Sequence, residues 1–119
     1  MIYAIENSSV SYIVEHGLWA LSNLCRGDPM PRFEFIKEAL PVLSSKIVEG
    51  WITEKETLSD CLWALSHNVK YSQEEINLML LDTGFHKKIP TFLFGEEVSI
   101  AIPVIRIFGN ITVSHDQLD

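Results

Sequence analysis

The sequence predicts an all-α protein, a solenoid of helical repeats. The main observation is a motif that occurs three times: LWALSNL at 18–24, LWALSHN at 62–68 and a looser IRIFGNI at 105–111. Trp19, Trp63 and Arg106 occupy the same place in the three copies, at spacings of 44 and 43 residues. A period in the forties with helical signals inside it is typical of solenoids whose repeats have two or three helices. No stretch of the chain shows the alternating apolar pattern of a sheet.

The composition agrees with one folded unit and limits its partners. The 119 residues suffice for one compact domain, and 47% hydrophobic residues are typical of a folded chain. A formal net charge of −7 disfavours nucleic acid and anionic membranes as partners and favours a cationic one. No apolar run reaches the length of a membrane-spanning helix, and no signal peptide opens the chain. Cys25 and Cys61 lie on or beside apolar helix faces, which indicates buried thiols and a reducing compartment.

The first half of the chain is expected to hold two long helices after a short apolar start. Residues 1–9 would close a preceding helix and supply an N-cap from the segment Asn7, Ser8, Ser9. The first long helix spans about 10–26 and ends at the Gly- and Pro-rich stretch 27–31. The next spans about 33–48 and ends at Gly50. It carries Pro41, which predicts a kink or an early break.

The second half is expected to hold two long helices separated by two short ones. The second Trp-bearing helix spans about 54–69. Ser72 and Glu75 form a capping box for a short helix over about 73–83, which Gly84 ends. The remaining expectations are a short helix over 85–94 containing Pro90 and ended by Gly95, and a long helix over 96–112 with a bend at Pro103.

One complete cycle of short, short and long helix is therefore expected in this second half. Three helices per cycle predict armadillo repeats rather than two-helix HEAT repeats. The chain, 1–119, is expected to be a single unit of about two and a half repeats. Its parts are the long helix of one repeat at 10–26, the next repeat at 32–70, a complete repeat at 72–113 and the start of another at 114–119. Such a fragment exposes apolar end faces, so we expect it either to be only marginally stable or to self-associate.

Helical geometry places two kinds of side chain on opposite faces of the three long helices. At about 100° per residue, the expected core positions are Val14, Leu18, Leu21, Leu24 and Cys25, then Leu58, Leu62, Leu65 and Val69, then Ile105, Phe108 and Ile111. The opposite faces carry Trp19, Asn23 and Arg26, then Asp60, Trp63, His67 and Lys70, then Arg106 and Asn110. A lone tryptophan is most simply a core residue. Two at the same register, opposite the leucines and beside polar groups, predict an outward row.

The sequence gives little support for an active site or a metal site. Cys61 and His67 are six residues apart, which places them on different sides of a helix. The serines near histidines lack a nucleophile elbow or an oxyanion loop. The four histidines are scattered without metal-ligand spacing, so we expect neither an enzyme nor a metal or cofactor site.

Three segments, LWALSNLCRG, SDCLWALSH and VIRIFGNIT, resemble consecutive armadillo repeats of importin α (karyopherin α), the adaptor that binds nuclear localisation signals. The resemblance covers nearly the whole chain, including LLDTGFHKKIP, and is weakest over 27–55. It implies a right-handed armadillo superhelix, here the fourth, fifth and beginning of the sixth repeat. It also implies a protein of the cytoplasm and nucleus.

The resemblance implies a site for basic cargo peptides, residue by residue. Its members are Trp19, Asn23 and Arg26 at the major site, Asp60 and Trp63 in the fifth repeat, His67 where a tyrosine usually stands, and Arg106 and Asn110 at the start of the minor site. Arg106 is expected to separate two peptide sites or to pair with a carboxylate. Importin β would bind the full-length protein through an amino-terminal segment outside this chain.

General chemistry agrees with such a site. Indoles form slots for the apolar stem of a lysine and attract its charged head, by about 0.5–2 kcal/mol each. An asparagine one turn further can bind the backbone of an extended peptide, and a carboxylate such as Asp60 can accept the cationic head. Two alternatives remain open: an armadillo scaffold that binds another protein without a role in nuclear import, and a divergent copy that has lost ligand binding.

Overall fold

The computed structural model describes residues 1–27, 29, 31–67 and 80–118, and for 111–118 it describes the backbone alone. Its helices are α1 (Ile2–Asn7), α2 (Ser11–Cys25), α3 (Phe33–Glu49), α4 (Lys55–Ser66), the 3-10 helix η1 (Phe85–Lys88), α6 (Ile89–Leu93) and α7 (Val98–Leu118). Residues 80–83 are also helical. No strand occurs within these ranges, and the predicted all-α class is confirmed.

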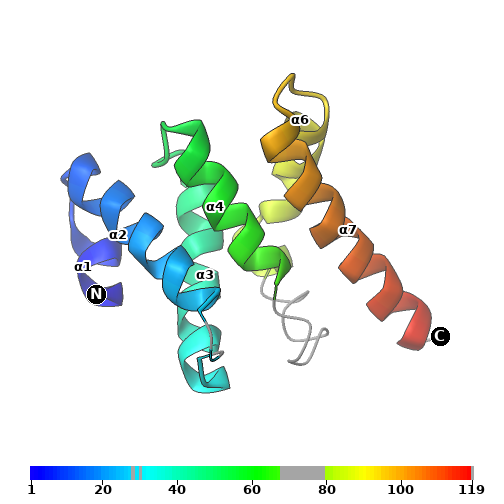
Figure 1. Ribbon diagram of the computed structural model, residues 1–119, viewed down its shortest axis with the longest axis horizontal. Coiled ribbons are helices and arrows are strands. Elements are labelled where there is room, and N and C mark those ends of the chain that lie inside the picture. The colour runs from blue at the N-terminus through cyan, green and yellow to red at the C-terminus, as the bar shows by residue number, and fades with distance from the viewer. Residues whose placement is uncertain (28, 30, 68–79, 119) are drawn as a thin grey trace.

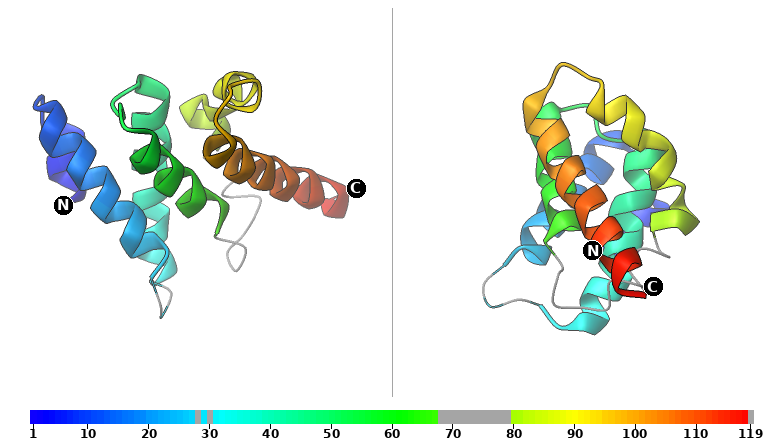
Figure 2. Two further views of the ribbon diagram at one scale, coloured as in Figure 1. Left: turned by 45° about the horizontal axis from the view of Figure 1, so that its top comes forward. Right: turned by 90° about the vertical axis from the view of Figure 1, so that its right-hand side faces the viewer.

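The helices form two layers. The long helices α2, α4 and α7 lie side by side in chain order and run in the same direction (Figure 1). Behind them lie α1, α3 and the η1–α6 pair, so each front helix packs against its partner in the second layer (Figure 2). The core between the layers consists of fully buried side chains, among them Leu18, Leu21, Ile36, Leu40, Leu43, Leu62 and Phe85. This staggered arrangement of repeated helices is the expected armadillo solenoid.

Glycine ends the helices where the sequence predicts. Gly50 adopts the left-handed conformation with φ 82°, which a residue without Cβ reaches most easily. The N–H of Gly50 donates to the carbonyl of Ile47 at 3.1 Å, and that of Trp51 donates to the carbonyl of Lys46 at 3.2 Å. These two bonds make a Schellman motif at the end of α3. Gly84, with φ 79°, also adopts the left-handed conformation, between the helical residues 80–83 and η1.

The two prolines inside long helices do not end them. Of the two outcomes predicted at Pro41, a kink or an early break, the early break does not occur, because α3 continues to Glu49. The flanking side chains Leu40, Val42 and Leu43 are buried, so packing of this face offsets the one backbone hydrogen bond that proline removes. Helix α7 likewise continues past Pro103 to Leu118, beyond the predicted end at 112.

Other boundaries differ by a few residues. Val10 is the N-cap of α2, whereas the sequence favours the polar segment 7–9. Ser8 instead accepts a hydrogen bond from the N–H of Val10 at 3.1 Å, just outside the helix. The segment predicted as one helix over 85–94 divides into η1 and α6, with Pro90 in the first turn of α6. The predicted capping box at Ser72, the start of its helix and the side chains of Val69 and Lys70 lie outside the described residues.

Three predicted core residues are exposed. Leu24 is 48% exposed, Ile105 58% and Phe108 54%. On α7 the buried positions are instead Ile100, Val104 and Ile107. Apolar residues surround most of α7, so periodicity alone assigned its core face one residue away from the true one.

A carboxylate of one long helix caps the next. Glu15 of α2 accepts hydrogen bonds from the backbone N–H groups of Thr53 at 3.0 Å and Glu54 at 2.9 Å, and from the Thr53 hydroxyl at 3.1 Å. Glu54 is the N-cap of α4, so Glu15 lies at the positive end of that helix. Burial alone would raise the pKa of Glu15, but these donors outweigh it and lower the pKa. The contact fixes α2 and α4 in register.

The register between α4 and α7 has its own polar contacts. The Ser59 hydroxyl of α4 donates to the carbonyl of Ser99 in α7 at 2.8 Å. Lys55, at the start of α4, pairs with Glu97 just before α7 at 2.6 Å. Each pair of front helices is therefore connected by side chains near its amino-terminal ends.

Replacing Glu15 with glutamine should lower the free energy of unfolding by about 1 kcal/mol at pH 7, because it removes a charged acceptor of two backbone N–H groups. The pKa of Glu15 is lowered in the folded state, so this stabilisation is present above the unfolded value, about 4.3, and is lost as pH falls through the folded value. Urea unfolding at pH 7 and pH 3.5 tests both points, with Glu38→Gln on the exposed face of α3 as the control. An equal effect of the two variants at pH 7 would contradict the capping role.

The exposed apolar stripe of α7, formed by Val98, Ile102, Ile105 and Phe108, should promote self-association. Ile105→Lys should lower the apparent mass in sedimentation velocity at high protein concentration. Phe94→Ser is the matched control, since Phe94 is 86% exposed but lies outside the stripe. A strict monomer in the unmodified chain at high concentration would refute the expectation.

Candidate functional site

Neither motif tryptophan is part of the packed core. Trp19 is 48% exposed and Trp63 is half-buried, while the leucines beside them in the motif, Leu18 and Leu62, are fully buried. Arg106, at the same place in the third copy, is exposed. The outward orientation predicted for this row is therefore what the structure shows. Helices α2, α4 and α7 are neighbours in the front layer (Figure 1), and the guanidinium carbon of Arg106 lies 6.0 Å from the centroid of the Trp63 ring.

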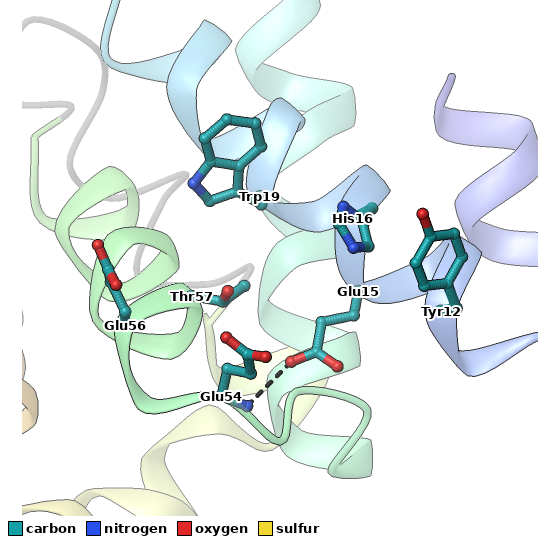
Figure 3. Close-up of a pocket in the computed structure, with 7 residues that line it drawn as sticks. All are labelled: Tyr12, Glu15, His16, Trp19, Glu54, Glu56 and Thr57. Carbon is teal, nitrogen blue, oxygen red and sulfur yellow. Dashed lines mark hydrogen bonds between the residues drawn. The ribbon is translucent and has the colours of Figure 1, made fainter.

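An acidic and aromatic cavity lies beside Trp19. It has a volume of about 380 Å³ and is lined by Tyr12, Glu15, His16 and Trp19 of α2 and by Glu54, Glu56 and Thr57 at the start of α4 (Figure 3). We call it the α2–α4 pocket. Three carboxylates line it together with aromatic rings, and no lysine or arginine does. This combination suits a cationic side chain with an apolar stem.

The aromatic wall of the pocket follows one face of α2. Tyr12, His16 and Trp19 are spaced at i, i+4 and i+7, so they lie one above another on the helix. The rings of Tyr12 and His16 have centroids 4.4 Å apart. Of the lining residues, sequence reasoning identified Trp19 alone. The helical spacing back from Trp19 could have found the other two aromatic rings, whereas the acidic wall depends on how α4 packs.

Arg26 holds together the polar residues that follow Trp19. Its guanidinium donates to the Asn23 side-chain oxygen at 2.8 Å and lies 3.7 Å from a carboxylate oxygen of Asp60. The pair between Arg26 and Asp60 crosses from α2 to α4. It partly neutralises Asp60, which makes that carboxylate a weaker acceptor for a ligand. Asn23 remains exposed, and within the described part of the chain its NH₂ group has no acceptor.

The surroundings of Trp63 differ from those of Trp19. The guanidinium carbon of Arg106 lies 6.0 Å from the centroid of the Trp63 ring, and the His67 ring meets the same indole edge-on at 6.0 Å. The Nδ1 of His67 lies 2.8 Å from the Trp63 carbonyl, and because a carbonyl only accepts, Nδ1 carries the proton. Arg106 forms no ion pair with any described carboxylate and instead contacts an aromatic ring; the other expectation, that it separates two peptide sites, stays a prediction.

Asn110 is also engaged within the chain. Its NH₂ group donates to the carbonyl of Ser66 at 3.1 Å, near the end of α4. The corresponding residue of the first copy, Asn23, makes no such bond to another helix. Of the eight predicted site residues, all described here, the structure brings Asn23, Arg26 and Asp60 into one cluster and Trp63, His67 and Arg106 into a second.

The cysteines do not belong to either cluster. Burial raises the pKa of both the Cys25 and Cys61 thiols to about 12. The Cys61 thiol donates to the Leu18 carbonyl at 3.7 Å, which is a packing contact between α4 and α2. Across the described ranges no three His, Cys, Asp or Glu side chains gather as they would around a metal ion. None of the helices there is both long and apolar enough to cross a membrane.

Comparison with known proteins agrees with the repeat pattern. No family model matches the chain. Importin subunit alpha-3 of Arabidopsis thaliana is 35% identical over 111 residues, 93% of this chain and 20% of the relative. Importin subunit alpha-B of Dictyostelium discoideum is 35% identical over 83% of this chain and 18% of the relative. Importin subunit alpha-1b of Oryza sativa subsp. japonica is 33% identical over 94% of this chain and 20% of the relative.

The chain spans about one fifth of the length of these relatives. Within that fifth the matched region covers 93–94% of this chain for two of these relatives. The chain therefore belongs to the importin α family.

Proposed function

We propose that this chain binds lysine- and arginine-rich peptides, the nuclear localisation signals of cargo proteins, in an extended conformation along the exposed face of α2 and α4. It would do so as part of a nuclear import adaptor that works in the cytoplasm and the nucleus. Membership of the importin α family supports the class of function. The single observation that carries the proposal is the α2–α4 pocket, where aromatic rings and carboxylates meet and no lysine or arginine is among the described lining residues.

Each wall of the pocket has a part in this binding. The exposed Trp19 indole packs against the apolar stem of a lysine and attracts its ammonium group. Glu54 and Glu56 accept the charged head from the α4 side. Glu15 already accepts the N–H groups of α4, so it adds negative potential rather than a free acceptor.

Asn23 binds the backbone of the peptide. Its exposed NH₂ group can donate to a carbonyl of the peptide, which makes the contact independent of peptide sequence. Neighbouring helices pack about 8–10 Å apart, which matches about three residues of an extended chain. The net charge of −7 favours encounter with a basic peptide through long-range attraction. Assignment to the fourth to sixth repeats, and contact with importin β through a segment outside this chain, belong to the same proposal.

A scaffold that binds another protein without a nuclear import role is the second candidate. Asp60 pairs with Arg26, and Asn110 donates to the Ser66 carbonyl. These contacts within the chain favour the scaffold, because they occupy two side chains that would otherwise bind the peptide. Such a scaffold should bind its partner whether or not lysines are present. The two functions are therefore separated by the dependence of binding on peptide charge.

Trp19→Ala should weaken binding of a lysine-rich peptide about three- to thirty-fold, because it removes the aromatic wall. Glu56→Gln should weaken it by up to about five-fold through loss of one exposed charge. Isothermal titration calorimetry measures both, with Glu38→Gln on α3 as a matched control and a peptide with alanine in place of lysine as a negative ligand. Loss of affinity equal to that of Glu38→Gln, or undiminished binding of the alanine peptide, would contradict the proposal.

A further inference from the structure

The aromatic wall of the α2–α4 pocket contains one ring that can carry a charge, the imidazole of His16. We propose that His16 is a specificity-determining residue of this pocket. When neutral, its ring extends the aromatic wall for the stem of a bound lysine or arginine, and when protonated, it repels the cationic head and weakens binding. The inference rests on the proposed function and adds a dependence of peptide affinity on pH.

Helix α2 holds the His16 ring at the edge of the pocket. The ring centroid of Tyr12, one turn earlier, lies 4.4 Å from that of His16, and the two rings are tilted by 46°. Figure 3 shows the His16 ring between Tyr12 and Trp19. At Gly17, the next residue, α2 lies so close to α1 that an added Cβ would be 2.6 Å from the Ile5 side chain. This close packing fixes the backbone that carries His16.

The charged groups that face His16 are acidic. Glu15, its neighbour on α2, interacts with it electrostatically, and Glu54 and Glu56 line the same pocket from α4. The other helices packed against α2 are α1 and α3. Their ionisable side chains that line a cavity line a different one, and these are Glu6, Lys46 and Glu49. A protonated His16 would therefore compete with the peptide for the carboxylates that attract both.

Among the side chains that line the pocket, histidine is the type whose charge ordinarily changes between about pH 5 and pH 8. Within the described ranges His16 makes a ring contact and no hydrogen bond through its ring nitrogens, so both nitrogens are open to solvent and to a ligand. A proton on His16 and a cation in the pocket disfavour each other, because like charges repel. Peptide affinity should therefore rise as pH rises through the histidine range.

His67, beside the second motif tryptophan, is placed differently. Its Nδ1 donates to the Trp63 carbonyl at 2.8 Å, and its ring meets the Trp63 indole edge-on. Glu54 and Glu56 lie at the opposite end of α4 from His67. The pH dependence should thus come mainly from His16, which makes His67 a suitable comparison.

The test is isothermal titration calorimetry of the 119-residue chain at about pH 6 and about pH 8, on either side of the histidine range. The ligand is a peptide of lysine, alanine and glycine with blocked termini, so that it does not titrate between these values. The unmodified chain should bind about two- to five-fold more tightly at the higher pH, the gain expected when one exposed like charge is removed. His16→Phe, which keeps a ring without a charge, should bind equally at both pH values and close to the affinity of the unmodified chain at the higher one.

Two matched variants separate this role from a general effect of histidine. His67→Phe and His86→Gln, the latter on the exposed side of η1, should keep the greater part of the pH dependence. A dependence that persists in His16→Phe, or that His67→Phe removes instead, would overturn the role of His16. Equal affinity of the unmodified chain at both pH values rejects that role while the proposed function stands. Absence of binding at either pH rejects the proposed function and the role of His16 together.

Discussion

Register between the front helices is the constraint on which the rest of the structure depends. Glu15 of α2 accepts hydrogen bonds from the N–H groups of Thr53 and Glu54, just before α4, and Asn110 of α7 donates to the carbonyl of Ser66, the last residue of α4. The Cys61 thiol of α4 adds a buried contact to the Leu18 carbonyl of α2. These contacts hold both ends of α4 against its neighbours. Residues about forty apart in the sequence therefore occupy equivalent positions on adjacent front helices.

Equivalent positions do not have equivalent chemistry, because the neighbours of each tryptophan differ. Beside Trp19, the start of α4 contributes acids to an open pocket. Beside Trp63, the third copy contributes Arg106, whose guanidinium carbon lies 6.0 Å from the ring centroid. The third copy carries Arg106 where the first two carry tryptophan, so it presents a cation to Trp63 and has no indole of its own at this place. Asymmetry of this kind lets a repetitive scaffold position a ligand along its length.

The repeat and the outward row could be predicted from the sequence, because both follow from helical periodicity and from residues at a fixed spacing. The α2–α4 pocket could not, since Glu54 and Glu56 join Tyr12 and Trp19 only through packing of separate helices. The pairing of Arg26 with Asp60 was missed for the same reason. The core face of α7 was misassigned because nearly every face of that helix is apolar. Helix α3 continues past Pro41 because burial of its neighbours outweighs one lost hydrogen bond.

The central claim is that a basic peptide binds at the Trp19 end of the front layer. The most direct test is a titration of the ¹⁵N-labelled chain with a lysine-rich peptide, in which the three indole N–H signals are followed. Trp51 is an internal reference, since it lies beyond α3 and donates its indole N–H to Glu49. We predict a saturable shift that is largest for Trp19, smaller for Trp63 and absent for Trp51. A largest shift at Trp51, or none at Trp19 under saturating peptide, would contradict it.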